Sequence, residues 1–273
     1  MDGMGMERIK KPLQLAGHDR SGAPEVVTEF SGDNYERMPR IAESAIEYTE
    51  TRVIDVGGDV FERTRVVTGR TQGPIANAYR LLRTQVLQQL QSRDWQTVAV
   101  VSPCAGEGKT LTGVNLAINL ASAGSHTSLL VDLDWYHPSV HKHFEYTPAP
   151  DVRDCLRGER TLAETIVNPG LPRFCFLPCA ESADDPPEYL GSLGGFVREL
   201  KNRYTNRIVL FDLPPLLATD DALSFLPLVD CALLVVEEGR TKRDDVARSI
   251  ELIGAERLLG TVLNKSWHRP SRY

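Results

Sequence analysis

The sequence predicts an α/β fold built on a doubly wound, mainly parallel sheet. Short apolar runs alternate with amphipathic stretches along most of the 273 residues, which is the pattern of strands joined by crossover helices. One apolar run, residues 97–101, leads into the small-residue loop 105–110 (AGEGKT), and two later runs end in aspartates. In doubly wound sheets, ligands bind beyond the carboxyl ends of the strands, where such loops and carboxylates gather.

Composition and charge exclude several classes of protein. Hydrophobic residues make up 41% of the chain and the formal net charge is −6, which lacks the basic balance that non-specific nucleic-acid binding needs. No apolar run approaches the roughly 18 to 20 residues that span a bilayer, and the N-terminus has no apolar secretory core. Five dispersed cysteines without a Cys-x-x-Cys pair indicate neither a disulfide framework nor a zinc site. We therefore expect a cytoplasmic protein with no nucleic-acid partner and no transmembrane segment of its own.

The first 72 residues predict a flexible N-terminal arm, because residues 1–72 are rich in Gly, Arg, Glu and Thr and contain few bulky apolar side chains. The folded domain is expected to begin at residue 73. From Pro74 onward, apolar residues recur at the spacing of one face of a helix of about five turns. These residues are Ile75, Tyr79, Leu82, Val86 and Leu90.

The run 97–101 predicts a strand, and the loop and helix after it form a phosphate-binding motif. Gly106 and Gly108 allow the backbone to curl until successive N–H groups point at one anion, near the positive end of the following helix. In this motif Lys109 reaches the β- and γ-phosphates and Thr110 ligates Mg²⁺. The usual eight-residue pattern starts with Gly, whereas this chain has Pro103, so the match is partial.

Later apolar runs predict the remaining strands, and three of them end in polar residues. The runs span residues 128–131, 174–177, 207–211, 231–236 and 258–263. Asp132 and Asp134 follow the first run, Asp212 follows the third, and Asn264 follows the fifth. Helices are expected between them, among others over residues 151–162 and 244–253. Asp132 and Asp134 can therefore lie beside the phosphate loop. Asp212, which closes an apolar strand, is expected to hold Mg²⁺ directly or through water.

With these elements in place, the sequence resembles the bacterial tyrosine kinase (BY-kinase) family of capsule and exopolysaccharide assembly, over about residues 74–265. Eight motifs in the family's order carry the resemblance. They are NAYRLLRT (77–84), SPCAGEGKT (102–110), LLVDLDWYHPSVHKHF (129–144), CLRGERTLAE (155–164), LPCAESADDPPEYLGS (177–192), VLFDLPPLLATDDA (209–222), LLVVEEGRT (233–241) and LLGTVLN (258–264).

The resemblance implies a P-loop fold of the ParA/MinD type, with an ATP-binding kinase domain over residues 73–265 and a C-terminal tail over 266–273. It assigns the catalytic roles to Lys109, Asp132 and Asp134, with Asp132 as the base near the incoming tyrosine hydroxyl. ATP is then bound by Gly106, Glu107, Gly108, Lys109, Thr110, Leu111 and Asn264. Asn264 faces adenine in similar ATPases. Mg²⁺ is then held by Thr110, Asp132 and Asp212.

The resemblance also implies an activity and partners. The chain is expected to be a non-specific protein-tyrosine autokinase that regulates capsule or exopolysaccharide polymerisation and export. Its expected partner is a membrane polysaccharide co-polymerase or activator with a cytoplasmic tail. It would then work as a homo-oligomer, peripheral at the inner face of the plasma membrane.

The chain departs from the family pattern at several positions. Tyr273 is the only tyrosine near its end, where family members carry a cluster of phosphorylated tyrosines. Asn77 replaces an acidic residue of the subunit-contact motif. Tyr136 and His137 replace basic residues after Asp134.

Two other functions stay open at this point. One is a catalytically weak, nucleotide-dependent regulator of the polysaccharide machinery, which the missing tyrosine cluster favours. The other is a positioning ATPase of the ParA/MinD type, which shares the fold and both aspartate motifs. That class usually has an extra lysine where this chain has Cys104, so the sequence favours the kinase.

Overall fold

The computed structural model describes residues 51–181, 190–203 and 206–266. Its centre is an eight-stranded sheet in the order β1-β4-β5-β3-β6-β2-β7-β8. The strands are β1 (Arg52–Val53), β2 (Thr97–Val101), β3 (Thr127–Asp132), β4 (Val167–Asn168), β5 (Phe174–Leu177), β6 (Arg207–Asp212), β7 (Cys231–Glu237) and β8 (Leu258–Asn264). Neighbouring strands pair in parallel except β4 and β5, which are antiparallel. The predicted mainly parallel α/β fold is therefore confirmed.

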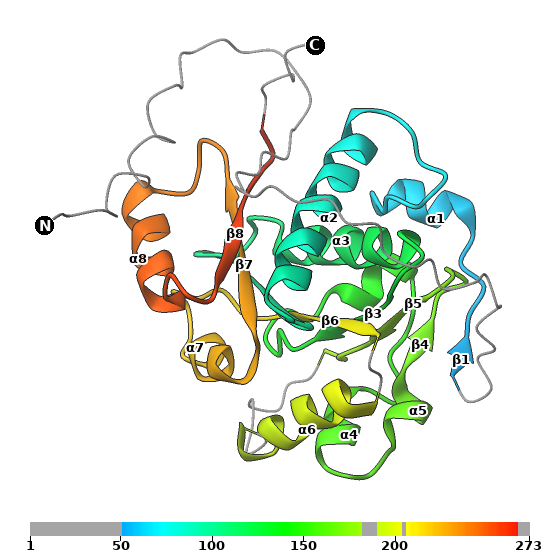
Figure 1. The fold of residues 1–273 in the computed structure, drawn as a ribbon. Coiled ribbons are helices and arrows are strands. Elements are labelled where there is room, and N and C mark those ends of the chain that lie inside the picture. The colour runs from blue at the N-terminus through cyan, green and yellow to red at the C-terminus, as the bar shows by residue number, and fades with distance from the viewer. Residues whose placement is uncertain (1–50, 182–189, 204–205, 267–273) are drawn as a thin grey trace, which may run out of the picture.

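Helices cover both faces of this sheet (Figure 1). One hydrophobic core lies under α2 (Pro74–Ser92) and α3 (Lys109–Ser122), and the other lies under α6 (Leu190–Arg203). The shorter helices are α1 (Gly58–Arg63), η1 (Val140–Phe144), α4 (Val152–Leu156), α5 (Leu162–Thr165), α7 (Asp221–Phe225), η2 (Leu226–Leu228) and α8 (Arg243–Ile253). Because alternate side chains of a central strand enter opposite cores, residues 98–101 of β2 are all apolar and buried.

Helix α2 differs from its prediction at one position. Tyr79, Leu82, Val86 and Leu90 are buried as expected, but Ile75 is 45% exposed and Ala76 is buried instead. The Cα–Cβ bonds of a helix tilt toward its N-terminus. A side chain in the first turn therefore leans past the end of the packed surface, and periodicity alone does not reveal this.

The predicted arm of residues 1–72 also differs from the structure in its second part. Residues 51–72 contain β1 and α1, and β1 extends the sheet by pairing with β4. Val60, Val66 and Val67 are buried against the domain. The arm as a whole is poor in apolar residues, yet Val66 and Val67 belong to the core under α2 and α3, and Ile54, Val56 and Phe61 pack against it. Residues 1–50 and 267–273, including Tyr273, lie outside the described residues.

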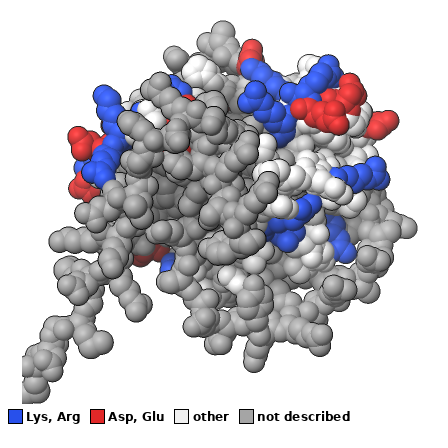
Figure 2. Space-filling view, turned by 90° about the horizontal axis from the view of Figure 1, so that it is seen from above, with Lys and Arg blue, Asp and Glu red and all other residues white. Residues whose placement is uncertain are grey.

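Two further observations concern the surface of the described residues. None of their helices is both long enough and apolar enough to cross a membrane. Figure 2 views the molecule from above and shows Lys and Arg side chains in separate groups, two of which have acidic side chains beside them. On the described part of this face, the positive charge is therefore divided among several small groups.

Candidate functional site

The loop 105–110 lies between β2 and α3 and needs glycine at two positions. Gly106 and Gly108 have φ values of +82° and +89°, which L side chains rarely adopt. A Cβ at Gly108 would also collide with the side-chain amide of Asn264, and one at Gly106 would lie 3.1 Å from Arg240 Nη1. Gly108 is the N-cap of α3, so this backbone directs the start of the helix into the site.

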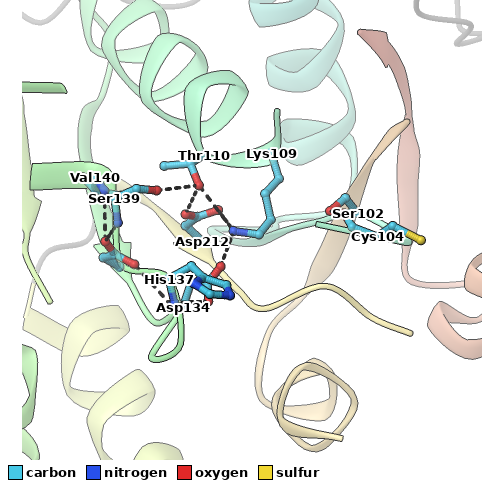
Figure 3. Close-up of polar contacts among 10 residues, drawn as sticks. Ser102, Cys104, Lys109, Thr110, Asp134, His137, Ser139, Val140 and Asp212 are labelled. Carbon is cyan, nitrogen blue, oxygen red and sulfur yellow. Dashed lines mark hydrogen bonds and ion pairs between the residues drawn. The ribbon is translucent and has the colours of Figure 1, made fainter. Parts of the chain in front are cut away.

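Lys109 and Thr110, the first residues of α3, meet carboxylates from two neighbouring strands (Figure 3). Lys109 Nζ lies 2.6 Å from Asp134 Oδ2 and 3.4 Å from Asp212 Oδ1. Thr110 Oγ1 donates to Asp212 Oδ2 at 2.6 Å. Strands β3 and β6 are neighbours, with Asp132 paired to Asp212 in register, so both bring their carboxyl ends to the loop. As expected, these side chains lie close together at one edge of the sheet.

Asp132 is fully buried and is held by backbone N–H groups. Its Oδ2 accepts hydrogen bonds from the amides of Ser139 and Val140, both at 3.0 Å, and its Oδ1 accepts one from the Asp134 amide at 3.2 Å. Ser139 also places its hydroxyl 3.3 Å from Thr110 Oγ1. The turn before η1 therefore determines where the Asp132 carboxylate lies relative to the loop.

The site holds more negative than positive charge. Burial raises the pKa of Asp132 well above its usual value, and the nearby Asp212 raises it further. Burial likewise raises the pKa of Asp212, although Lys109 partly offsets this. Burial alone would lower the pKa of Lys109, but Asp212 and Asp134 outweigh it and raise the lysine pKa. Three carboxylates around one ammonium group leave an excess that a bound cation would compensate.

The back of the loop is held by Thr241 and Lys265, which the sequence did not identify as functional. Glu107 is buried, and its two carboxylate oxygens accept from the Thr241 hydroxyl at 2.6 Å and from the Cys104 amide at 3.0 Å. Lys265 Nζ donates to the carbonyl of Gly106 at 2.8 Å. Thr241 and Lys265 follow β7 and β8, so the ends of these strands brace the loop. The only sequence signal for Thr241 was its place at the end of the motif LLVVEEGRT.

The predicted nucleotide residues divide into two groups. Lys109 and Thr110 share one cluster with the aspartates, whereas Asn264 lies on the other side of the loop, where its Nδ2 donates to the Glu107 carbonyl at 2.9 Å. Leu111 is half-buried in the first turn of α3. Asn264 is therefore in contact with the loop backbone, and the roles of these residues in nucleotide binding stay predictions.

No protein-family model matches the chain, but individual proteins do. The tyrosine-protein kinase YwqD of Bacillus subtilis is 27% identical over 221 residues, which are 79% of this chain and 92% of YwqD. The succinoglycan biosynthesis transport protein ExoP of Rhizobium meliloti is 28% identical over 76% of this chain, a match that spans 27% of ExoP.

The chain is also similar to solved structures, including a kinase domain. The VpsO kinase domain superposes with a TM-score of 0.61 and 26% identity, over 68% of this chain and 93% of that one. The cell division ATPase MinD of Pyrococcus furiosus, at a TM-score of 0.50 and 23% identity over 60% of this chain and 68% of that one, shares the fold.

Proposed function

Because this chain is related to the bacterial tyrosine-protein kinases, we propose that it is itself an ATP-dependent protein-tyrosine kinase. The observation that carries the proposal is the cluster of Lys109 and Thr110 with Asp134 and Asp212 at the start of α3. A lysine, a hydroxyl and carboxylates at a phosphate-binding loop are the groups that phosphoryl transfer requires. ATP with Mg²⁺ would supply the phosphoryl group and the charge that balances the carboxylates.

The side chains have distinct roles in the proposed reaction. Asp132 accepts the proton of the tyrosine hydroxyl, whose oxygen bonds to the γ-phosphorus as the bond to the bridging oxygen of ADP breaks. Its raised pKa makes Asp132 a stronger base than an exposed carboxylate. Lys109 turns from the carboxylates to the phosphates, and Asp134 keeps the lysine near the loop beforehand.

The residues at the loop fit a magnesium ion. The hydroxyl of Thr110 and the carboxylate of Asp212 face one another, and both are hard oxygen ligands of the kind Mg²⁺ takes. Mg²⁺ is usually bound by one or two carboxylates together with substrate phosphates and water. Asp132 lies beside Asp212 and adds the next carboxylate of the predicted magnesium set.

The name of one relative supports the proposed membrane partner. ExoP is named as a transport protein of succinoglycan biosynthesis, and the present chain matches about a quarter of its length. We propose that this chain works in exopolysaccharide or capsule production, as a homo-oligomer on the cytoplasmic face of the plasma membrane. Its activator would be a membrane co-polymerase with a cytoplasmic tail. Recovery of the protein without any membrane protein, after gentle crosslinking in cells, would contradict this partner.

One observation favours the weaker-catalyst alternative. Tyr136 stands where the family carries a basic residue, and its hydroxyl donates to Asp221 Oδ2 at 2.9 Å. A tyrosine bound to an aspartate adds no positive charge near the phosphates. The alternative is a nucleotide-dependent regulator that binds ATP and transfers its phosphate slowly.

Labelling with γ-³²P-ATP tests the proposal. The wild type, incubated with its membrane activator, should form phosphotyrosine, and Lys109→Met should abolish both the label and tight ATP binding. Lys201→Met is the matched control, because Lys201 pairs with Asp230 next to the start of β2, at the opposite edge of the sheet. Tight ATP binding without phosphotyrosine would favour the regulator. Unchanged ATP affinity in Lys109→Met would overturn the site itself.

A further inference from the structure

A short segment ahead of α2, residues 63–67, lies between the two parts of the molecule that carry the site. One part is η1 with the residue before it, because the amides of Ser139 and Val140 hold Asp132. The other is α3, which begins with Lys109 and Thr110. The segment falls in the stretch that the sequence predicts to be a flexible arm, so no function was assigned to it.

The segment is joined to η1 by a two-way contact. The Thr64 hydroxyl lies 3.0 Å from the carbonyl of His143 and 2.8 Å from that of Val60, so its single proton is shared between them. The His143 ring nitrogen Nδ1 lies 3.3 Å from the Thr64 carbonyl. The nearby ion pair of Arg63 and Glu145 is exposed and contributes little. Thr64 therefore connects the segment to the C-terminal end of η1.

The same segment is joined to α3 by buried amides. The backbone N–H of Val67 donates to Asn115 Oδ1 at 2.6 Å, and Asn115 Nδ2 donates to the Arg65 carbonyl at 3.1 Å. Asn119 Nδ2 reaches the Val67 carbonyl at 3.4 Å. Leaving a buried amide without its partner costs about 1–3 kcal/mol. The segment and the helix are therefore fixed to one another.

These contacts join the two halves of the site through residues 63–67. Figure 3 shows Ser139 and Val140 reaching the site from one side, with Lys109 and Thr110 on the other. We infer that residues 63–67 form a brace that positions η1, and through it Asp132, against the phosphate loop. Thr64 is the positioning residue of this brace. The catalytic consequence rests on the proposed kinase function, whereas the brace itself does not.

Thr64→Val tests the brace, with Thr84→Val as the matched control. Both variants lose a threonine hydroxyl bonded to the carbonyl four residues earlier, but only Thr64 also contacts η1. Thr64→Val should lower kcat for phosphotyrosine formation at least about fivefold, a barrier increase of about 1 kcal/mol. The KM for ATP should change by less than about twofold, because the loop itself keeps its contacts.

Rescue by the conservative variant separates positioning from general destabilisation. Thr64→Ser keeps the hydroxyl that contacts the His143 carbonyl and should retain the wild-type kcat. Thr84→Val should also retain it.

Hydrogen exchange provides a readout without catalysis. Peptides covering residues 138–144 should exchange faster in Thr64→Val than in the wild type or Thr84→Val. A wild type without kinase activity would defeat the proposed function and leave this comparison intact. If Thr64→Val does not fold, Thr64→Ala is compared with Thr64→Ser in the same way. Equal exchange of 138–144 and an unchanged kcat in the folded variant would overturn the brace.

Discussion

Replacing Lys109 with Met should destabilise the chain, and by more at pH 8 than at pH 5. The lysine side chain is 9% exposed, and it is the ammonium group in contact with Asp134 and Asp212. Removing one partner of a buried ion pair costs about 3–5 kcal/mol, because the remaining charge stays buried without compensation. At pH 8 we therefore expect the free energy of unfolding to fall by about that amount.

The pH dependence follows from the direction of the carboxylate pKa values. The pKa values of Asp132 and Asp212 are raised in the folded chain. The two carboxyl groups therefore contribute fully to stability below the usual carboxyl pKa, and this contribution is lost as the pH rises through their pKa values in the folded chain. Loss of Lys109 raises them further. As the pH rises, each unit over which the folded variant holds one proton more than the folded wild type widens the difference in unfolding free energy between them by about 1.4 kcal/mol.

Urea unfolding followed by tryptophan fluorescence, at pH 5, 6, 7 and 8, measures this difference. Lys201→Met is again the control, because Lys201 helps to lower the pKa of Asp230 rather than raise it. Its cost should be below about 1 kcal/mol and constant from pH 5 to 8, since Asp230 stays ionised throughout. Lys109→Met combined with Asp212→Asn should recover part of the loss. A Lys109→Met difference that is constant over this pH range would refute the reasoning.

Two further predictions concern the loop. Gly108→Ala places a Cβ against Asn264 at a φ of +89° and should weaken binding of a fluorescent ATP analogue more than about tenfold. Gly158→Ala is the control, because Gly158 also has a positive φ but lies in open space. It should lower the free energy of unfolding by about 1 kcal/mol and leave the affinity for the analogue unchanged. Equal affinities in the two variants would contradict the requirement for glycine. Thr241→Val removes a donor to the buried Glu107 carboxylate and should lower the free energy of unfolding by about 1–3 kcal/mol in the same urea assay. A change below about 0.5 kcal/mol would contradict the role of Thr241 in holding the phosphate loop.

The central part of the fold could be predicted because its strands are buried on both faces. Residues 98–101 and 208–211 are continuous apolar runs, so each predicts a strand without reference to its neighbours. The two-residue strands β1 and β4 are too short to show any periodicity, and only their pairing identifies them, β1 with β4 and β4 also with β5. Composition averaged over the first 72 residues likewise concealed the few valines that join the core.

The residues of the candidate site could be predicted where a motif that is continuous in the sequence, or the end of a strand, indicates them. Lys109 and Thr110 follow from the loop, and Asp212 follows from the rule that parallel strands end at one edge. The contact of Glu107 with Thr241 joins residues 134 positions apart, and neither residue type alone indicates it. The brace at Thr64 was missed for the same reason, because its partner His143 is 79 residues away.

The excess of negative charge at the loop links the stability of the chain to its proposed activity. Asp132 and Asp212 lie side by side with raised pKa values, which is unfavourable for folding above the usual carboxyl pKa. The same two carboxylates are those we expect to meet Mg²⁺ and the tyrosine proton. A ligand that binds the folded chain but not the unfolded chain stabilises the folded state by mass action. A divalent cation also lowers the pKa of the carboxylates that it contacts. Mg-ATP should therefore stabilise the wild type more at pH 8 than at pH 5, and Asp212→Asn should reduce that difference.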